Sequence, residues 1–210
     1  MAAEGHLSKP FVVGSVAYSL GKKAEESATH EWTVYLRSAN PDEDISMYVK
    51  HVVFILHPTL SPPTRTIDTA PFEVTDRGWG EFEISLQIFF HDSREKPMEL
   101  NHMLKLYPDT ESTTPQHVAK PVVSERYDEF VFNSPSDALR QRLTAELPPS
   151  SKGWRHSPHA KYLNDFEVDA PQAALQQIYQ QVTADLQNAS VRRRELERAL
   201  GDLRGAGDGL

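Results

Sequence analysis

A tryptophan flanked by two glycines is the feature of this 210-residue sequence that packing alone explains least well. Trp79 lies between Gly78 and Gly80, in a stretch with turn-forming neighbours. Glycine lets a backbone approach a ligand closely and adopt positive φ, and an indole in a loop offers a flat apolar face. The pattern predicts a binding surface. The alternative is that Trp79 plugs one end of the fold.

A second loop segment of the same kind covers residues 56–64, where a histidine, two threonines and three prolines follow an apolar run. Like the tryptophan-containing segment, residues 71–82, it lies next to a strongly predicted strand. We therefore expect strands to present both loops, and we expect their chemistry to be recognition of a ligand.

No catalytic constellation accompanies these loops. The sequence lacks the common phosphate-loop, nucleophile-elbow and paired-histidine zinc motifs. His51 and His57 are about 20 Å apart in an extended chain, too far to share one ion. His156 and His159 have a suitable spacing but no third ligand nearby in the sequence. We predict a protein that is not an enzyme and that carries neither a metal nor a cofactor.

The first 133 residues are predicted to be β-structure. The clearest signal is a strict alternation over residues 81–90, where every second residue is apolar, which is typical of a half-buried antiparallel strand. Further strands are predicted from apolar or β-branched runs at residues 11–18, 32–36, 48–56, 100–106 and 122–132. About seven or eight strands without intervening helices favour a two-sheet sandwich. A closed barrel is the alternative.

After residue 133 the sequence predicts three further segments: a short helix, a linker and a coiled coil. A short helix is predicted over residues 134–147, with Ser134 as N-cap and Pro135 in the first turn. Residues 148–171 show no periodicity and are predicted to be a linker. Residues 172–204 place apolar side chains at heptad spacing, which predicts a C-terminal α-helical coiled coil. The alternative is a single amphipathic helix folded back on the sandwich.

Composition and charge narrow the class of partner. The sequence contains no cysteine, which excludes a disulfide scaffold and a cysteine-ligated zinc site. Residues 1–150 hold 14 Lys and Arg against 22 Asp and Glu, whereas residues 151–210 hold eight of each. The first part should repel phosphate backbones and attract basic polypeptides, so we expect no direct binding of nucleic acid. With neither a signal segment nor a membrane span expected, we predict a soluble intracellular protein.

The two loops carry a resemblance to the YEATS domain family. The sequence Thr-His-Glu-Trp-Thr-Val-Tyr at residues 29–35 resembles an early strand of that family. Residues 56–65 resemble its histidine- and threonine-containing loop, and residues 71–84 resemble its second loop. The resemblance covers residues 9–133. With the C-terminal heptads, it points to the short coiled-coil branch, a subunit shared by histone acetyltransferase and chromatin-remodelling complexes.

This resemblance implies an immunoglobulin-like sandwich that reads acetylated or crotonylated lysine on histone H3 tails. Trp79 would stack on the flat amide, the Thr59 hydroxyl would hydrogen-bond to it, and the backbone N–H of Trp79 would donate to its carbonyl oxygen. The implied acyl-lysine site consists of His57, Thr59, Leu60, Gly78, Trp79, Gly80 and Phe82. Glu73 and Asp76 are candidate contacts for the arginine that precedes many tail lysines.

Two positions depart from the family pattern. Leu60 stands where members usually have phenylalanine or tyrosine, and Ala28 stands where some have a further aromatic residue. The slot would then have one aromatic wall and one aliphatic wall. This arrangement should weaken stacking on a flat crotonyl group more than binding of an acetyl group.

The resemblance also implies partners and a location. The protein is expected in the nucleus, in NuA4-type histone acetyltransferase and SWR1-type histone-exchange complexes, which it would join through residues 172–204. One alternative is a structural adaptor whose acyl-lysine pocket is dispensable, and another is an enzyme on a sandwich scaffold. The cluster at residues 192–194 is interpreted as a solvated helix face, with a nuclear import signal as the alternative.

Overall fold

The computed structural model describes residues 5–21, 24–25, 28–108, 120–145 and 153–166, together with ten residues between 178 and 193. The chain divides into two compact units, Met1–Phe166 and Glu167–Leu210, and each is considered separately. The first unit contains the β-structure and both loops of interest.

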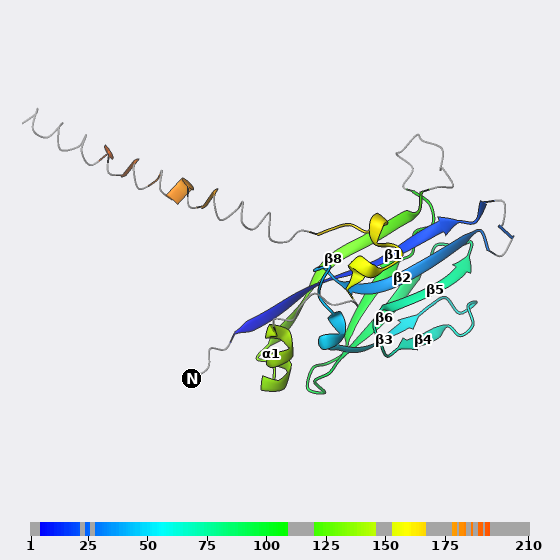
Figure 1. Cartoon of the computed structure of the whole chain (residues 1–210), viewed down its shortest axis with the longest axis horizontal. Coiled ribbons are helices and arrows are strands. Elements are labelled where there is room, and N and C mark those ends of the chain that lie inside the picture. The colour runs from blue at the N-terminus through cyan, green and yellow to red at the C-terminus, as the bar shows by residue number, and fades with distance from the viewer. Residues whose placement is uncertain are drawn as a thin grey trace, which may run out of the picture. The chain divides into compact units, whose positions relative to one another are not determined.

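Eight antiparallel strands in the first unit form two four-stranded sheets (Figure 1). The strands are β1 (His6–Ser19), β2 (His30–Ser38), β3 (Val49–Ile55), β4 (Thr64–Ile67), β5 (Phe72–Gly78), β6 (Glu83–Phe90), β7 (Met98–Met103) and β8 (Val122–Asn133). One sheet has the order β5-β2-β1-β8 and the other β4-β3-β6-β7. The predicted sandwich is confirmed in this part of the chain, and the barrel alternative is wrong.

The core lies between the two sheets and follows the strand periodicity. Along β6 the apolar side chains Ile84, Leu86 and Ile88 are fully buried, while the intervening residues are more exposed. On the opposing sheet, Trp32 of β2 and Phe130 of β8 are also fully buried. A period of two thus places one face of each sheet in the core.

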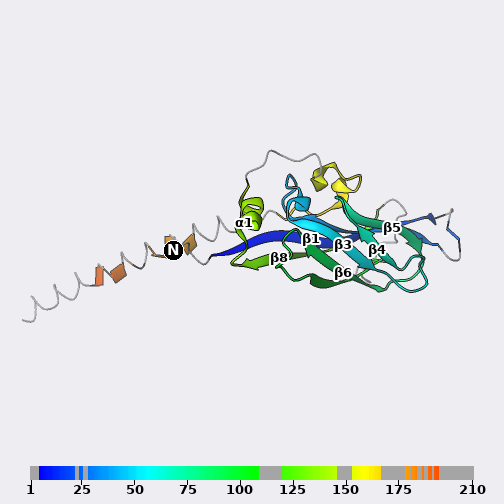
Figure 2. The same cartoon turned by 90° about the horizontal axis from the view of Figure 1, so that it is seen from below.

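The sheet that contains β1 and β2 is also covered on its outer face. Residues 153–166, here called the strap, form two short 3-10 turns, Trp154–His156 and Ala160–Tyr162. Figure 2 shows them on the side of β1 and β2 that faces away from β6. The strap lies inside the stretch predicted as a linker. It is held by polar and aromatic contacts, which have no periodicity and which the sequence therefore did not reveal.

A buried ion pair anchors the strap. Arg37 of β2 donates to Glu125 of β8 at 2.8 Å and to the Asn164 carbonyl oxygen at 2.7 Å, and its guanidinium lies 4.2 Å from the centre of the Trp154 ring. Glu125 in turn accepts from the Asn164 N–H at 2.8 Å. A Cβ at Gly14 of β1 would lie 2.7 Å from Cγ of Glu125, so this position needs the smallest residue.

The helix after β8 begins later than predicted. Helix α1 spans Asp137–Thr144, and the side chain of Ser136 caps it by accepting from the Leu139 N–H. Ser134 has a φ of 52° and is not the N-cap. Pro135 therefore precedes the helix, whose first turn also gains a favourable acidic residue in Asp137. Residues 146 and 147 of the predicted helix lie outside the described residues.

In the second unit, each described residue is helical. Its apolar side chains Ile178, Val182 and Leu186 are 60–71% exposed in the single chain. The coiled coil was predicted over residues 172–204, and the other residues of this range lie outside the described residues. The pairing of this helix with another stays a prediction. Among the described residues, no helix is long and apolar enough to cross a membrane.

Candidate acyl-lysine site

The topology brings both loops to one end of the sandwich. Strands β3 and β6 are antiparallel neighbours in which Ile55 pairs with Ser85. The loop after β3 (residues 56–63) and the loop before β6 (residues 79–82) therefore leave the same end of this strand pair. Gly78, the last residue of β5, pairs with His30 at the start of β2, so the other sheet ends there too.

Hydrogen bonds within the β3–β4 loop orient the Thr59 hydroxyl. The Thr59 N–H donates to Nδ1 of His57 at 3.3 Å, so that nitrogen is the acceptor and the imidazole proton resides on Nε2. Oγ1 of Thr59 lies 2.9 Å from the same Nδ1, so the hydroxyl is the donor in this contact. The oxygen lone pairs of Thr59 are then available to accept from a ligand N–H.

Trp79 is a surface residue in the β5–β6 loop. Its side chain is 66% exposed, which excludes the alternative that it plugs the end of the sandwich. A Cβ at Gly80 would meet nothing within 4 Å, whereas one at Gly78 would lie 3.5 Å from Nε1 of Trp32. The backbone around Trp79 is therefore open to a ligand on the Gly80 side and lies close to the core on the Gly78 side.

Phe82 connects this surface to the core. Its ring packs edge-on against Trp32 and against His57, with a centroid distance of 5.8 Å in both pairs. Leu60 is partly buried against the same core. The structure thus brings His57 and Phe82 into contact. It places Thr59, Leu60 and Trp79 in the two loops at the same end of the sandwich, and their role in binding stays a prediction.

Two buried nitrogens beneath the loops were not anticipated. Nε1 of Trp32 and Nε2 of His30 are buried and lack a hydrogen-bond partner in the described part of the chain. Burial lowers the pKa of His30, which keeps its ring neutral at ordinary pH. Both residues lie in the Thr-His-Glu-Trp segment, but nothing in their spacing distinguishes them from ordinary core residues.

Glu81 ties the β5–β6 loop, which contains Trp79, to the rest of the domain. One of its carboxylate oxygens accepts the backbone N–H groups of Leu106 and Tyr107, at 2.8 and 3.1 Å. The Leu104 N–H also donates to the Phe82 carbonyl oxygen at 3.0 Å. These bonds tie the β5–β6 loop to the segment after β7, although the sequence suggested no role for Glu81.

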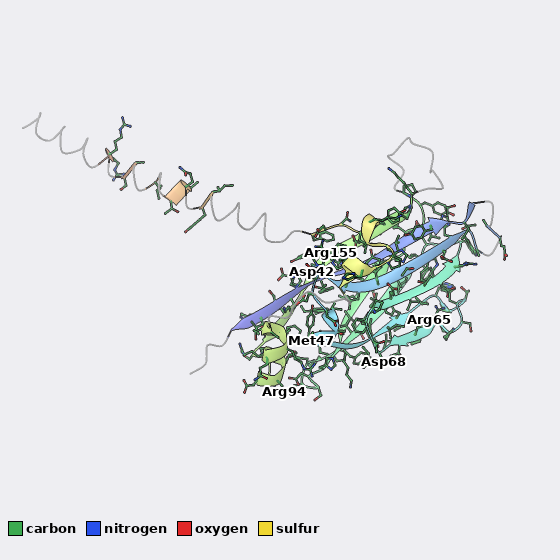
Figure 3. All side chains as sticks on the ribbon, in the orientation of Figure 1. Asp42, Met47, Arg65, Asp68, Arg94 and Arg155 are labelled. Carbon is green, nitrogen blue, oxygen red and sulfur yellow. The ribbon has the colours of Figure 1, made fainter. Side chains whose placement is uncertain are left out.

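The two predicted acidic contacts do not lie together. Glu73 and Asp76 are three residues apart on β5, so their side chains lie on opposite faces of the sheet. Asp76 forms a salt bridge with Arg65 of β4, which is labelled in Figure 3, and also accepts the Arg77 N–H. The expectation that both carboxylates contact one tail arginine is corrected by this strand parity.

The described residues contain no group of three or more histidine and acidic side chains that could hold a metal ion. His159 instead contacts the Tyr18 hydroxyl, with 2.9 Å between Nδ1 and the oxygen. What the loop end offers is an oriented hydroxyl, an exposed indole and an open backbone. These groups suit the recognition of a neutral amide better than bond cleavage.

Comparisons with known proteins agree with this geometry. The family model described as the YEATS family matches residues 27–108, which include both loops. The chain is 52% identical over 138 residues to transcription initiation factor TFIID subunit 14b of Arabidopsis thaliana, a match that covers 65% of this chain and 51% of that protein. It therefore spans about half the length of that relative.

A fungal relative is matched over more of its length, and solved structures share the fold. The AF-9 homolog of Saccharomyces cerevisiae is 32% identical over 196 residues, covering 84% of this chain and 86% of that protein. The yeast AF-9 homolog Yaf9 has a TM-score of 0.59 and 34% identity, over 69% of this chain and 96% of that one. The structure of the Yaf9 YEATS domain bound to H3K27ac has a TM-score of 0.58 and 35% identity, over 68% of this chain and 96% of that one.

Proposed function

Because this chain belongs to the YEATS family, we propose that it is a chromatin protein that reads acylated lysine on histone H3 tails. The observation that carries the proposal is Trp79, an exposed indole in a glycine-flanked loop at the same end of the sandwich as the oriented hydroxyl of Thr59. It is supported by structures of the related Yaf9 domain, described as bound to H3K27ac and as recognising an H3K122suc peptide.

The ligand amide would be held by complementary groups. Its N–H would donate to Thr59, whose own proton is directed to His57. The carbonyl oxygen of the amide would accept a hydrogen bond from the backbone N–H of Trp79, and the plane of the amide would stack on the indole ring. Leaving either amide group unpaired in such a site costs about 1–3 kcal/mol, so both bonds contribute to selection.

Discrimination against unmodified lysine follows from charge. Two acidic side chains at this end of the sandwich are already engaged, Asp76 by Arg65 and Glu81 by backbone N–H groups. An ammonium entering the slot would lose water without gaining a carboxylate partner, which is unfavourable. Acylation removes that charge and leaves a group that the slot can satisfy.

Titration of acetylated and unmodified H3 peptides tests this function. We expect the full chain to bind the acetylated peptide at least roughly tenfold more tightly than the unmodified one. Thr59→Val, which keeps the shape but removes the hydroxyl, should remove most of that preference. The matched control is Thr66→Val on β4, an exposed threonine outside both loops, and it should bind like the unaltered chain. Equal binding of the two peptides would refute the reader function.

A second candidate function is that of a structural adaptor in the nucleus. The exposed apolar side chains of the second unit and the name of the Arabidopsis relative, a subunit of a transcription initiation factor, favour it. In this case residues 172–204 would join the protein to NuA4-type and SWR1-type complexes. Deleting them should abolish incorporation into such complexes and spare peptide binding. If Trp79→Ala then had no cellular effect, adaptor function would be the essential one.

A further inference from the structure

A cavity of about 190 Å³ lies between the strap and the outer face of the sheet. Its walls come from the ends of β2 and β5 and from the first turn of the strap, and include Tyr35, Pro71, Glu73, Trp154, His156 and Leu163. The β2–β5 pair runs from His30–Gly78 near the loops to Leu36–Phe72 near the cavity. These pairs are six residues apart, so the cavity lies about 20 Å from the Trp79 loop.

Two polar groups of the cavity wall have no partner. The Glu73 carboxylate makes no hydrogen bond or ion pair with any described residue, although the side chain is half-buried. Nε1 of Trp154 is buried and likewise unpaired in the described part of the chain. The Glu73 carboxylate lines the cavity and can accept a cation there, whereas Nε1 of Trp154 is enclosed by the protein and is not open to a ligand.

The neighbouring charges are already neutralised. Arg37 is paired with Glu125 and stacked on Trp154. Glu43 is paired with Lys9 at 2.6 Å. Asp42, beside Arg155 in Figure 3, is 3.2 Å from its guanidinium. Of the two described carboxylates that line the cavity, Glu43 has a paired lysine, whereas Glu73 forms no salt bridge with a described residue.

Burial also raises the pKa of Glu73, with His159 acting weakly in the opposite direction. A carboxylate in this position is poorly solvated, and a cation placed beside it would restore the stability of its charged form. The nearby aromatic and aliphatic walls suit the methylene stem of a long basic side chain, since such stems pack on apolar surfaces.

We propose that this cavity binds the side chain of an unmodified lysine or arginine from a basic peptide. The cationic head would pair with Glu73, and the methylene stem would pack against the ring of Trp154, which lines the cavity. The overall charge of −8 favours such a partner. The site is separate from the Trp79 loop and has the opposite preference, because it selects a charged side chain. It does not depend on the acyl-lysine function.

The test uses the indole N–H signals of the ¹⁵N-labelled full chain in NMR, one from each of its three tryptophans. Hexalysine, hexaarginine and an uncharged hexaglutamine peptide are titrated separately. We expect the lysine or arginine peptide to shift the Trp154 signal in a saturable way and hexaglutamine to leave it unchanged. Comparing the two basic peptides shows which cation fits better. The variants Trp154→Phe and Trp79→Phe assign the signals.

Charge removal gives the decisive comparison. Glu73→Gln should weaken the titration at least roughly tenfold, whereas Glu99→Gln, an exposed glutamate on β7 of the other sheet, should leave it unchanged. Trp79→Ala should also leave it unchanged, so failure here is distinct from failure of acyl-lysine reading. An unmoved Trp154 signal, or equal effects of Glu73→Gln and Glu99→Gln, would overturn the proposal. If Trp154→Phe does not fold, the comparison of Glu73→Gln with Glu99→Gln in the titration still tests the proposal.

Discussion

Two tryptophans on the surface of the sandwich differ in almost every physical respect. Trp79 is 66% exposed in a loop. Trp154 lies against the guanidinium of Arg37 and helps to hold the strap on the sheet. The same residue type is therefore available to a ligand at one end of the domain and committed to the fold along its side.

The difference teaches where stability and recognition are separated in this molecule. The loops around Trp79 connect strands that are anchored in the core. Substitutions in these loops should therefore weaken ligand binding more than they lower the stability of the fold. The strap is held by a buried ion pair, where removal of one partner leaves a charge without compensation. Four predictions test this separation and the packing behind it, in order of decreasing expected effect.

Removing Arg37 should give the largest effect. In Arg37→Ala, Glu125 becomes a buried carboxylate without its cation, so we expect a loss of about 3–5 kcal/mol in the free energy of unfolding, measured by urea denaturation. The matched control is Arg77→Ala, whose pair with Glu31 is 62% and 41% exposed, and where a loss of about 0–1 kcal/mol is expected. Similar losses in the two variants would show that the strap is not anchored as described.

Acid should weaken the core between the two sheets. Burial lowers the pKa of His102 to about 4, and its Nε2 lies 2.9 Å from the Ser15 hydroxyl oxygen. A lowered histidine pKa disfavours protonation in the folded state, so the free energy of unfolding is highest above pH 6.5 and falls as the pH drops toward 4. The free energy of unfolding should be lower at pH 4 than above pH 6.5 by about 3 kcal/mol.

Urea denaturation at several pH values checks this sign. The variant His102→Gln, which keeps a polar group near Ser15, should show a shallower loss between pH 6.5 and 4. If its pH dependence matched that of the unaltered chain, the acid sensitivity would have to arise elsewhere, and His30 is the next group to test because burial lowers its pKa as well.

Truncating each surface tryptophan should separate the two roles directly. Trp79→Ala should weaken binding of an acetylated H3 peptide by roughly tenfold or more, equivalent to ~1.4 kcal/mol, and leave the melting temperature nearly unchanged. Trp154→Ala should instead cost about 1–3 kcal/mol of stability, since its ring is partly buried and stacked on a cation. A collapse of the fold in Trp79→Ala would contradict the exposed position of its ring.

The smallest effect should come from restoring an aromatic wall. If Leu60 and Trp79 form the two walls of the slot, Leu60→Tyr should tighten binding of an acylated H3 peptide about two- to tenfold, from roughly 0.5–1.5 kcal/mol of stacking. The gain should be larger for a crotonyl group than for an acetyl group, because the former is flat over a greater length. Unchanged or weaker binding would count against a slot with two walls.

The sandwich could be predicted from the sequence because alternation is a local signal. The five apolar residues at alternate positions from Phe82 to Phe90 were enough to identify β6 and the face that it buries. The same rule would have separated Glu73 from Asp76, whose spacing of three places them on opposite faces. The strap could not be predicted from its own residues, since ion pairs and ring contacts between distant segments leave no period.

A signal for the strap was nevertheless present in the strands beneath it. Residues 11–18 form an unbroken run of apolar and small residues, and residues 11–17 are all buried. A sheet with only one covered face would alternate, so a continuous run indicates a cover on the other side. The unpaired nitrogens of Trp32 and His30 had no such signal, because they depend on the positions of neighbouring atoms.

The docking of Asn164 onto Glu125 has a practical consequence for where this domain ends. A recombinant fragment cut after α1 would still contain all eight strands, yet it would lose the strap from the outer face of the sheet and leave the guanidinium of Arg37 without the Trp154 ring that lies against it. Such a fragment should be prone to self-association. The smallest autonomous folding unit therefore extends to Phe166, which contacts Tyr127 of β8, well past the last strand.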